Sequence, residues 1–151
     1  VETSSGHLSI STMHLAKGLE FEWLVESDCL MRGDPHVIKE ILYNLLTNAI
    51  KYTEKGVVSL RAALEPSRDQ IRLEVTDTGR GIPEDELPFI FESFRQAGSP
   101  SALRHGGVGL GLAIVKRLLG LLGGQIEVKS ALNEGSTFKV ALPRVFKPQT
   151  K

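Results

Sequence analysis

Cysteine is nearly absent from this chain of 151 residues, which contains only Cys29. A single cysteine excludes an intrachain disulfide and a zinc site built from several cysteines. An excess of one charge is also absent, because 18 basic residues balance 18 acidic ones. Without a basic surplus we expect no nucleic-acid partner. With 41% hydrophobic residues and no long charged block, the chain is expected to fold as one globular domain.

The sequence also has no apolar run long enough to cross a membrane. Its most apolar stretch, residues 110–122, is interrupted by Lys116 and Arg117 and is far shorter than the roughly 20 residues of a transmembrane helix. The first ten residues lack the apolar core of a signal peptide. We therefore expect a cytoplasmic domain that makes no membrane contact itself, whether or not its parent protein is membrane-anchored.

Hydrophobic periodicity and turn residues predict alternating strands and helices. This order favours an α+β fold, a two-layer α/β sandwich in which three helices cover one face of a mixed, mostly antiparallel five-stranded sheet. The expected elements are a strand at 19–26, a helix at 35–52, a hairpin of strands at 57–65 and 71–77, short helical pieces at 84–96, a helix at 110–122, and strands at 125–132 and 136–143.

A polar stripe borders the apolar face of the expected helix at 35–52. Its members, Glu40, Asn44, Asn48 and Lys51, fall within about 80° of one another at 100° per residue. Asparagine is a poor helix former, but its carbonyl oxygen suits a hard cation, and an ammonium group suits phosphate. An ordinary solvated helix face is the alternative, and the helix taken alone favours that alternative.

The stretch DTGRGIP follows the strand that ends at Asp77. An ionised carboxylate there is a hydrogen-bond acceptor suited to an exocyclic amine. Gly79 and Gly81 would let a flat ring approach the backbone closely. A surface turn is the alternative, although the position at a strand end favours a binding site.

Glycines crowd the stretch RHGGVGLGLAIVKR, residues 104–117, directly before an apolar helical run. The stretch is not a P-loop, because no Gly-Lys-Ser/Thr follows, and it does not fit the dinucleotide pattern G-x-G-x-x-G. The glycines nevertheless precede a helix whose first amide groups are unpaired and whose dipole favours an anion. Phosphate binding by a different kind of glycine loop is therefore an open alternative.

Taken together, these stretches closely resemble the sequence boxes of one protein family. DPHVIKEILYNLLTNAIKYT, DTGRGIP, IFESFRQ, GGVGLGLAIVKRL and GSTF occur in that order over residues 15–143, and they are similar to the N, G1, F and G2 boxes of sensor histidine-kinase catalytic domains. That family belongs to the superfamily of ATP-binding domains that includes gyrase, Hsp90 and MutL. The resemblance implies the Bergerat fold, ATP and Mg²⁺ as ligands, and a domain spanning residues 15–145.

The resemblance also implies roles for single residues. Asn48 corresponds to the Mg²⁺ ligand, Lys51 to a phosphate contact, and Asp77 to the residue that accepts a hydrogen bond from the adenine amine. The remaining nucleotide contacts implied are Tyr52, Gly79, Gly81, Phe94, Gly107, Gly109, Leu110, Gly111 and Thr137, with Thr137 at the floor of the adenine site.

A lid over the nucleotide is implied at about residues 95–108, anchored by Phe91 and Phe94. Many family members carry an arginine at the position of Gln96. Because that arginine is missing here, Arg104 is the implied residue for stabilising the transferred phosphoryl group, together with Lys51 and Asn44 at the catalytic end.

Asn44 separates a kinase from an ATPase in this superfamily. Gyrase-like members place a water-activating glutamate four residues before the metal-binding asparagine, and an amide cannot act as a general base. Glu40 lies one turn further away and is expected to be an ordinary surface charge. The attacking group is therefore expected to come from another domain.

The resemblance implies that this group is a histidine of a dimerisation domain, which then passes the phosphoryl group to a receiver domain. None of His7, His14, His36 and His105 lies in a phosphoacceptor box, so the acceptor is expected outside the chain. Residues 1–14 would then be a linker or the end of that dimerisation domain, and residues 146–151 a tail. A serine kinase or ATPase of the same superfamily, and a non-catalytic nucleotide-binding module, are the alternatives.

Overall fold

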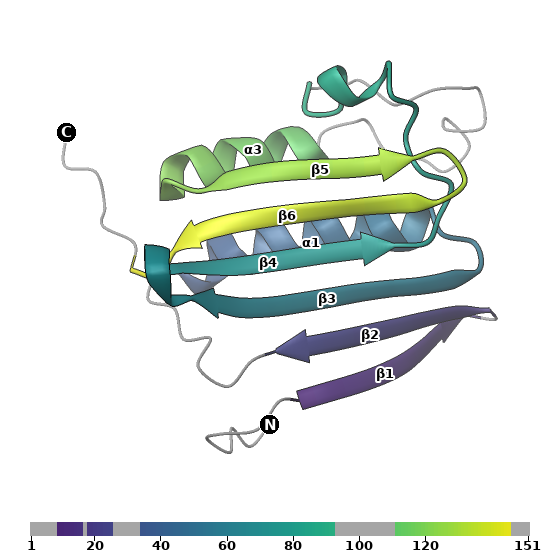
Figure 1. The fold of residues 1–151 in the computed structure, drawn as a ribbon, viewed down its shortest axis with the longest axis horizontal. Coiled ribbons are helices and arrows are strands. Elements are labelled where there is room, and N and C mark those ends of the chain that lie inside the picture. Colours follow the sequence, from purple (N-terminus) through teal and green to yellow (C-terminus); the bar gives the residue numbers. More distant parts are fainter. Residues whose placement is uncertain (1–8, 17, 26–33, 93–110, 146–151) are drawn as a thin grey trace.

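One sheet with helices on a single face forms the body of the molecule (Figure 1). The computed structural model describes residues 9–16, 18–25, 34–92 and 111–145. The elements are β1 (Ser9–Ala16), β2 (Leu19–Val25), α1 (Pro35–Lys51), β3 (Gly56–Glu65), the 3₁₀ turn η1 (Pro66–Arg68), β4 (Gln70–Asp77), the 3₁₀ turn η2 (Leu87–Phe89), α3 (Gly111–Leu122), β5 (Gln125–Ala131) and β6 (Gly135–Pro143).

The strands follow the order β1-β2-β3-β4-β6-β5. Only β2 and β3 pair in parallel among the described strands, with α1 connecting them, and all other neighbours are antiparallel. The predicted fold class, a mixed and mostly antiparallel sheet with helices over one face, is confirmed. Asp77, at the end of β4, lies at the same end of the sheet as the turn between β5 and β6 (Figure 1).

Two details of the prediction are corrected by the structure. The described sheet has six strands, because Ser9–Ala16 pairs with β2. Residues 9–14, which the sequence assigned to a linker, therefore belong to a strand at the edge of the sheet. The expected helical pieces after residue 84 yield, within the described residues, only the short turn η2, since Pro88 has no N–H to continue a helix there.

Helix α1 begins where the sequence places an N-cap. The Asp34 carboxylate accepts a hydrogen bond from the His36 N–H at 2.9 Å, and Pro35 occupies the first helical position. The apolar sides of α1 and α3 lie against the sheet. The buried hydrophobic residues are Leu19, Ile41, Leu45, Ala49, Val58, Ala62, Ile71, Leu73, Val75, Ile90, Val115, Leu119, Leu122, Phe138, Val140 and Leu142.

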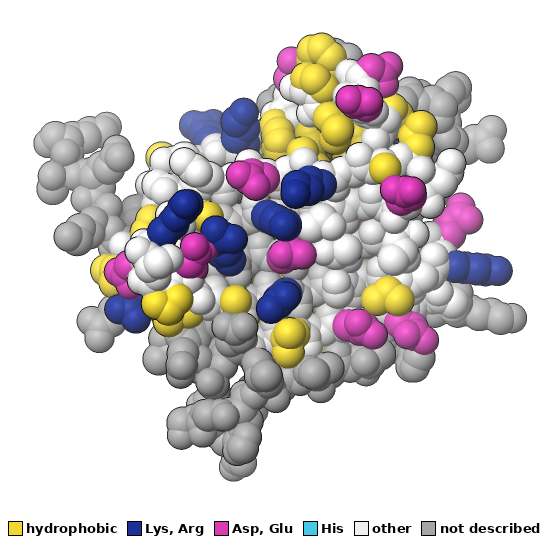
Figure 2. Space-filling view, viewed as in Figure 1, with side chains coloured by type: hydrophobic (Ala, Val, Ile, Leu, Met, Phe, Trp, Pro, Cys, Tyr) yellow, Lys and Arg dark blue, Asp and Glu magenta, His cyan; other side chains and the backbone are white. Residues whose placement is uncertain are grey.

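The other face of the sheet carries charged side chains. Arg61, Glu74, Lys139 and Glu127 are register partners across β3, β4, β6 and β5, so opposite charges face one another along this row. Figure 2 shows this face, with basic and acidic side chains interspersed over the strands. Hydrophobic side chains gather instead around η2, at the top of the view, where Phe89 is 37% exposed. The open face is thus a solvated, charged surface.

Candidate functional site

Asp77 is a buried carboxylate at the end of β4. It is 6% exposed, and its Oδ1 accepts a hydrogen bond from the Gly79 N–H at 2.9 Å. Burial raises the pKa of Asp77 above its ordinary value, while hydrogen bonds from the backbone N–H groups of Gly79 and Ser136 act in the opposite direction. The carboxylate is therefore held in place by the Gly79 N–H in a site whose burial disfavours its charge.

The two glycines after Asp77 are required by close packing within the protein. A Cβ on Gly79 would collide with the Tyr52 carbonyl oxygen and lie 2.8 Å from Thr53 Oγ1. Gly81 has a φ of +71°, and a Cβ there would collide with the Ala131 carbonyl oxygen. The loop that starts at Asp77 is thus pressed against the end of α1 on one side and the end of β5 on the other.

Tyr52 connects the end of α1 to this loop. Its carbonyl oxygen accepts a hydrogen bond from the Arg80 N–H at 3.3 Å. The Arg80 guanidinium carbon lies 4.5 Å from the centre of the Tyr52 ring, and Lys51 Nζ lies 5.4 Å from the same centre. Cation–π attraction of this kind favours a fixed ring position. The structure therefore brings Lys51 and Arg80 to the Tyr52 ring, and Gly79 to both the Tyr52 carbonyl and the Asp77 carboxylate.

Asn44 lies beside the start of α3. Its Nδ2 donates to the Glu40 carbonyl oxygen at 2.9 Å. The Asn44 Oδ1 atom lies 3.2 Å from the position that a Cβ on Gly111 would take. The glycine at the first position of α3 therefore leaves room for the Asn44 amide.

Asn48 lies one helical turn after Asn44 on α1 and is half-buried. Its amide oxygen is a hard ligand of the kind that Mg²⁺ accepts. No group of three or more His, Cys, Asp or Glu side chains able to hold a metal occurs within the described residues. An Mg²⁺ ion that takes one amide from the protein and the rest of its ligands from phosphates and water fits this donor set.

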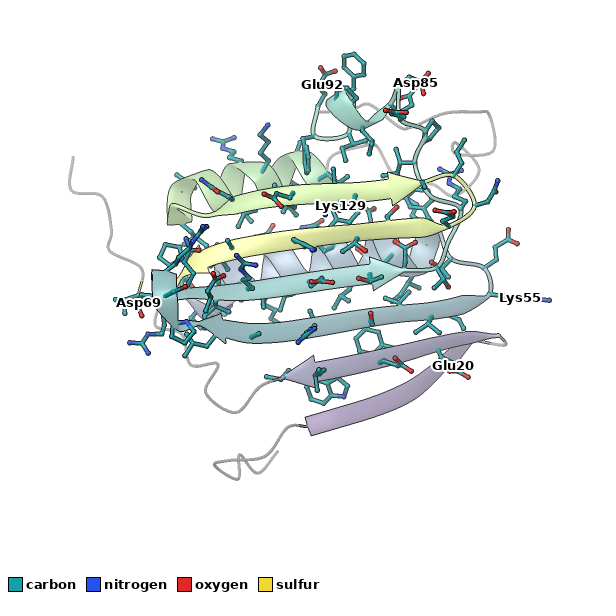
Figure 3. All side chains as sticks on the ribbon, viewed as in Figure 1. Glu20, Lys55, Asp69, Asp85, Glu92 and Lys129 are labelled. Carbon is teal, nitrogen blue, oxygen red and sulfur yellow. The ribbon has the colours of Figure 1, made fainter. Side chains whose placement is uncertain are left out.

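Thr137 is not beside Asp77, contrary to the sequence-based assignment. Asp77 and Ser136 are register partners, as are Thr76 and Thr137, and successive strand residues point to opposite faces. The Thr76 and Thr137 hydroxyl oxygens lie 3.2 Å apart, on the face opposite to Asp77. Lys129, which is labelled in Figure 3, is the β5 partner of Thr137 on that open face. Ser136 takes the place beside Asp77.

Sequence reasoning also missed a group of hydroxyls next to Ser136. Ser130 Oγ accepts a hydrogen bond from the Ile82 N–H at 2.7 Å, donates to the Gly135 carbonyl oxygen at 3.0 Å, and lies 2.7 Å from Ser136 Oγ. Thr53, just after the end of α1, is 3% exposed, and its hydroxyl has no hydrogen-bond partner among the residues that the structure describes. The alternation of buried Phe138, Val140 and Leu142 along β6 would have identified Ser136.

The other predicted site residues lie outside the described part of the chain. They are Phe94, Arg104, Gly107, Gly109 and Leu110, together with the expected lid at residues 95–108. Phe91, the first expected lid anchor, is half-buried against the core, and Lys116 Nζ on α3 lies 5.4 Å from the centre of its ring.

The sequence of the chain matches a family of ATP-hydrolysing domains. Residues 33–145 match the model of the family described as "Histidine kinase-, DNA gyrase B-, and HSP90-like ATPase". The chain belongs to this family. The matched range runs from just before α1 to the end of β6, so the ATPase domain contains every candidate residue described above.

Within this ATPase family the chain is similar to sensor histidine kinases. It is 42% identical over 127 residues to the signal transduction histidine-protein kinase BarA of Escherichia coli strain K12, over 81% of the chain and 14% of BarA. It is 47% identical over 110 residues to the sensor histidine kinase AruS of Pseudomonas aeruginosa, over 71% of the chain and 11% of AruS. The chain thus spans about a seventh of the length of BarA.

Solved structures agree with this placement in the ATPase family. Full-length ShkA in complex with AMPPNP superposes with a TM-score of 0.73 at 31% identity, covering 97% of this chain and 33% of ShkA. The mycobacterial sensor histidine kinase MprB superposes with a TM-score of 0.69 at 30% identity, covering 88% of this chain and 85% of that one. The predicted histidine-kinase catalytic domain is confirmed. None of the helices in the described ranges has the length and apolarity to cross a membrane.

Proposed function

We propose that this ATPase domain binds ATP with Mg²⁺ and transfers the γ-phosphoryl group to a histidine on a separate dimerisation domain of its parent protein. A receiver domain would take the phosphoryl group next. The family assignment supports the use of ATP, and the similarity to sensor histidine kinases supports histidine as the acceptor. The remaining steps are derived from the site residues.

Asp77 would recognise the base. Its buried carboxylate accepts a hydrogen bond from the Gly79 N–H and keeps acceptor capacity for the exocyclic amine of adenine. Tyr52, whose ring is bracketed by the Lys51 and Arg80 cations, would lie along the nucleotide. The base and sugar would therefore be held at the end of β4.

Asn48 and Lys51 would act at the phosphate end. The Asn48 amide oxygen would hold Mg²⁺, which neutralises phosphate charge when it is bound. The Lys51 ammonium, at the C-terminal end of α1, would contact phosphate oxygens. Arg104, from the expected lid, would stabilise the charge of the group in transfer. In the transfer a histidine nitrogen bonds to the γ-phosphorus while the bond to the β,γ-bridging oxygen breaks, and ADP leaves.

The Asn44 amide is the observation that favours transfer over hydrolysis. Its Nδ2 hydrogen bond to the Glu40 carbonyl oxygen fixes the side chain, and an amide does not take a proton from water. Asn44 therefore supplies no base for water attack where gyrase-like ATPases have a glutamate. A nucleophile delivered from another domain needs no such base when it is a neutral imidazole, which is already nucleophilic.

The test is phosphorylation of the cognate histidine-bearing helical hairpin. The chain is incubated with ATP, Mg²⁺ and the hairpin from its own parent protein, and the expected product is an acid-labile, base-stable phosphohistidine on the hairpin. A hairpin with the acceptor histidine replaced by alanine is the matched control. Fast ATP hydrolysis by the chain with no phosphohistidine would support an ATPase and overturn the proposal. Nucleotide binding with neither reaction would indicate a non-catalytic module.

A further inference from the structure

A seam of hydrogen bonds joins the loop that follows Asp77 to the hairpin of β5 and β6. The Asn133 N–H donates to the Arg80 carbonyl oxygen at 2.7 Å, and the Ile82 N–H donates to Ser130 Oγ at 2.7 Å. Gly135, with a φ of +105°, lies so close to Asp77 that a Cβ would collide with the Asp77 carbonyl oxygen. Ser130 is the side chain in this seam with the most partners.

The hydrogen positions in this seam follow from counting donors. Ser130 has one hydroxyl hydrogen, and the Gly135 carbonyl at 3.0 Å is an acceptor only. In the 2.7 Å contact between Ser130 Oγ and Ser136 Oγ, either hydroxyl can donate. All three contacts of Ser130 are satisfied together in the arrangement that gives the Ser130 hydrogen to Gly135 and the Ser136 hydrogen to Ser130. Ser130 accepts from both Ile82 and Ser136, which uses both of its lone pairs.

Ser136 is left with acceptor capacity alone. It is 7% exposed, lies opposite Asp77 in register, and shares its sheet face. The two side chains at this end of the site, Asp77 and Ser136, therefore both present acceptors, and neither has a hydrogen to offer to a ligand.

We infer that Ser130 is a positioning residue that makes the site selective for a 6-amino purine over a 6-oxo purine, by holding the Ser136 hydroxyl hydrogen away from the base. This inference rests on the proposed function, because it takes the ligand to be a purine nucleotide. An amino group donates to two acceptors, whereas a carbonyl oxygen facing two acceptors is left unpaired and repelled. Loss of the Ser130 hydroxyl frees the Ser136 hydrogen to point at a carbonyl oxygen.

The experiment compares ADP and IDP, which differ at this position of the base, by titration calorimetry with Mg²⁺. The wild-type chain is expected to prefer ADP. In Ser130→Ala the ratio of the two dissociation constants is expected to narrow by about tenfold, the effect of about one hydrogen bond. Ser130→Thr keeps a hydroxyl and is expected to keep the wild-type ratio. Thr76→Val, which removes a hydroxyl from the pair on the opposite face of the sheet, is the matched control.

A double-mutant cycle separates hydrogen ordering from simple loosening of the loop. With Ser136 already replaced by alanine, adding Ser130→Ala should leave the ADP to IDP ratio unchanged. Equal weakening of both nucleotides in Ser130→Ala, or an unchanged ratio, would overturn the inference while leaving the proposed function intact. A wild-type chain without preference for ADP would overturn the inference together with the role proposed for Asp77 in recognising the adenine amine. A wild-type chain that binds neither nucleotide would overturn the proposed function and this inference with it.

Discussion

Replacing Asp77 with asparagine should separate nucleotide binding from stability. The substitution keeps the size of the side chain and one carbonyl oxygen. In the wild type, Asp77 Oδ1 accepts from the Gly79 N–H at 2.9 Å, and the asparagine oxygen can still accept this hydrogen bond. The other position becomes an NH₂ group, which is a donor. That donor would face either the Ser136 N–H or the amine of the base, and both of these are donors as well.

The expected loss of affinity follows from the bond that is removed. A hydrogen bond to a charged group contributes about 1.5–3 kcal/mol, so ADP or ATP should bind about 10- to 100-fold more weakly. The measurement is titration calorimetry of wild-type and Asp77→Asn chains with Mg²⁺ and nucleotide. Thr76→Val, on the adjacent position of β4 and the opposite face, should leave the affinity unchanged.

In the absence of nucleotide, Asp77→Asn should not lower the stability of the domain and can raise it. Burial raises the pKa of Asp77, so its protonated form is favoured in the folded chain relative to the unfolded chain. The contribution of this group to stability is then fully present below the unfolded-state pKa and is lost as the pH rises through the folded-state pKa. Asp77→Asn cannot titrate, so its melting temperature at neutral pH should equal or exceed that of the wild type.

Thermal melts of both chains between mildly acidic and neutral pH give the decisive comparison. As the pH rises, the melting temperature of Asp77→Asn should increase relative to that of the wild type. If the variant instead melts well below the wild type at neutral pH and binds nucleotide with unchanged affinity, Asp77 is a structural residue and the reasoning is wrong.

Three further substitutions test the fold and the register of the site. Asp34→Ala removes the N-cap bond to the His36 N–H and should lower the unfolding free energy by about 1 kcal/mol in a urea titration, with nucleotide affinity unchanged. Leu45→Ala, at a side chain 1% exposed, should cost about 2–5 kcal/mol in the same titration. Thr137→Val should leave the ADP affinity unchanged in calorimetry, whereas Ser136→Ala should weaken it. The reverse result would indicate that Thr137, and not Ser136, lies beside the base.

The sequence predicts those parts of the site that depend on local pattern. The alternation of Ile71, Leu73 and Val75 along β4 extends to Asp77 and predicts that its carboxylate shares the core face. The same rule applied to β6 would have assigned Ser136 rather than Thr137 to the site. Thr137 was assigned from the match of GSTF to the family motif alone, and such a match does not report on which face of β6 each residue lies.

Other features depend on contacts between distant parts of the chain, which periodicity does not report. The Ser130 hydroxyl is recognisable only when β5, β6 and the loop containing Ile82 are together. β1 was missed for a different reason. Its hydroxyl-rich sequence lacks the hydrophobic alternation of an inner strand, and a strand at the sheet edge does not need it. Gly18, with a φ of +88°, marks the turn to β2 and was the available signal.

The base end and the phosphate end of the proposed site have different roles. This difference would explain how a kinase holds ATP without hydrolysing it until the acceptor histidine is present. At the base end, Asp77 and the hydrogen bonds around Ser130 would provide the acceptors that select the nucleotide. At the phosphate end, Asn44 is tied to the Glu40 carbonyl and supplies no base for water. Under the proposed function, selective binding combined with slow hydrolysis would keep ATP intact until a nucleophile arrives. Catalytic control would then rest with the domain that brings the histidine.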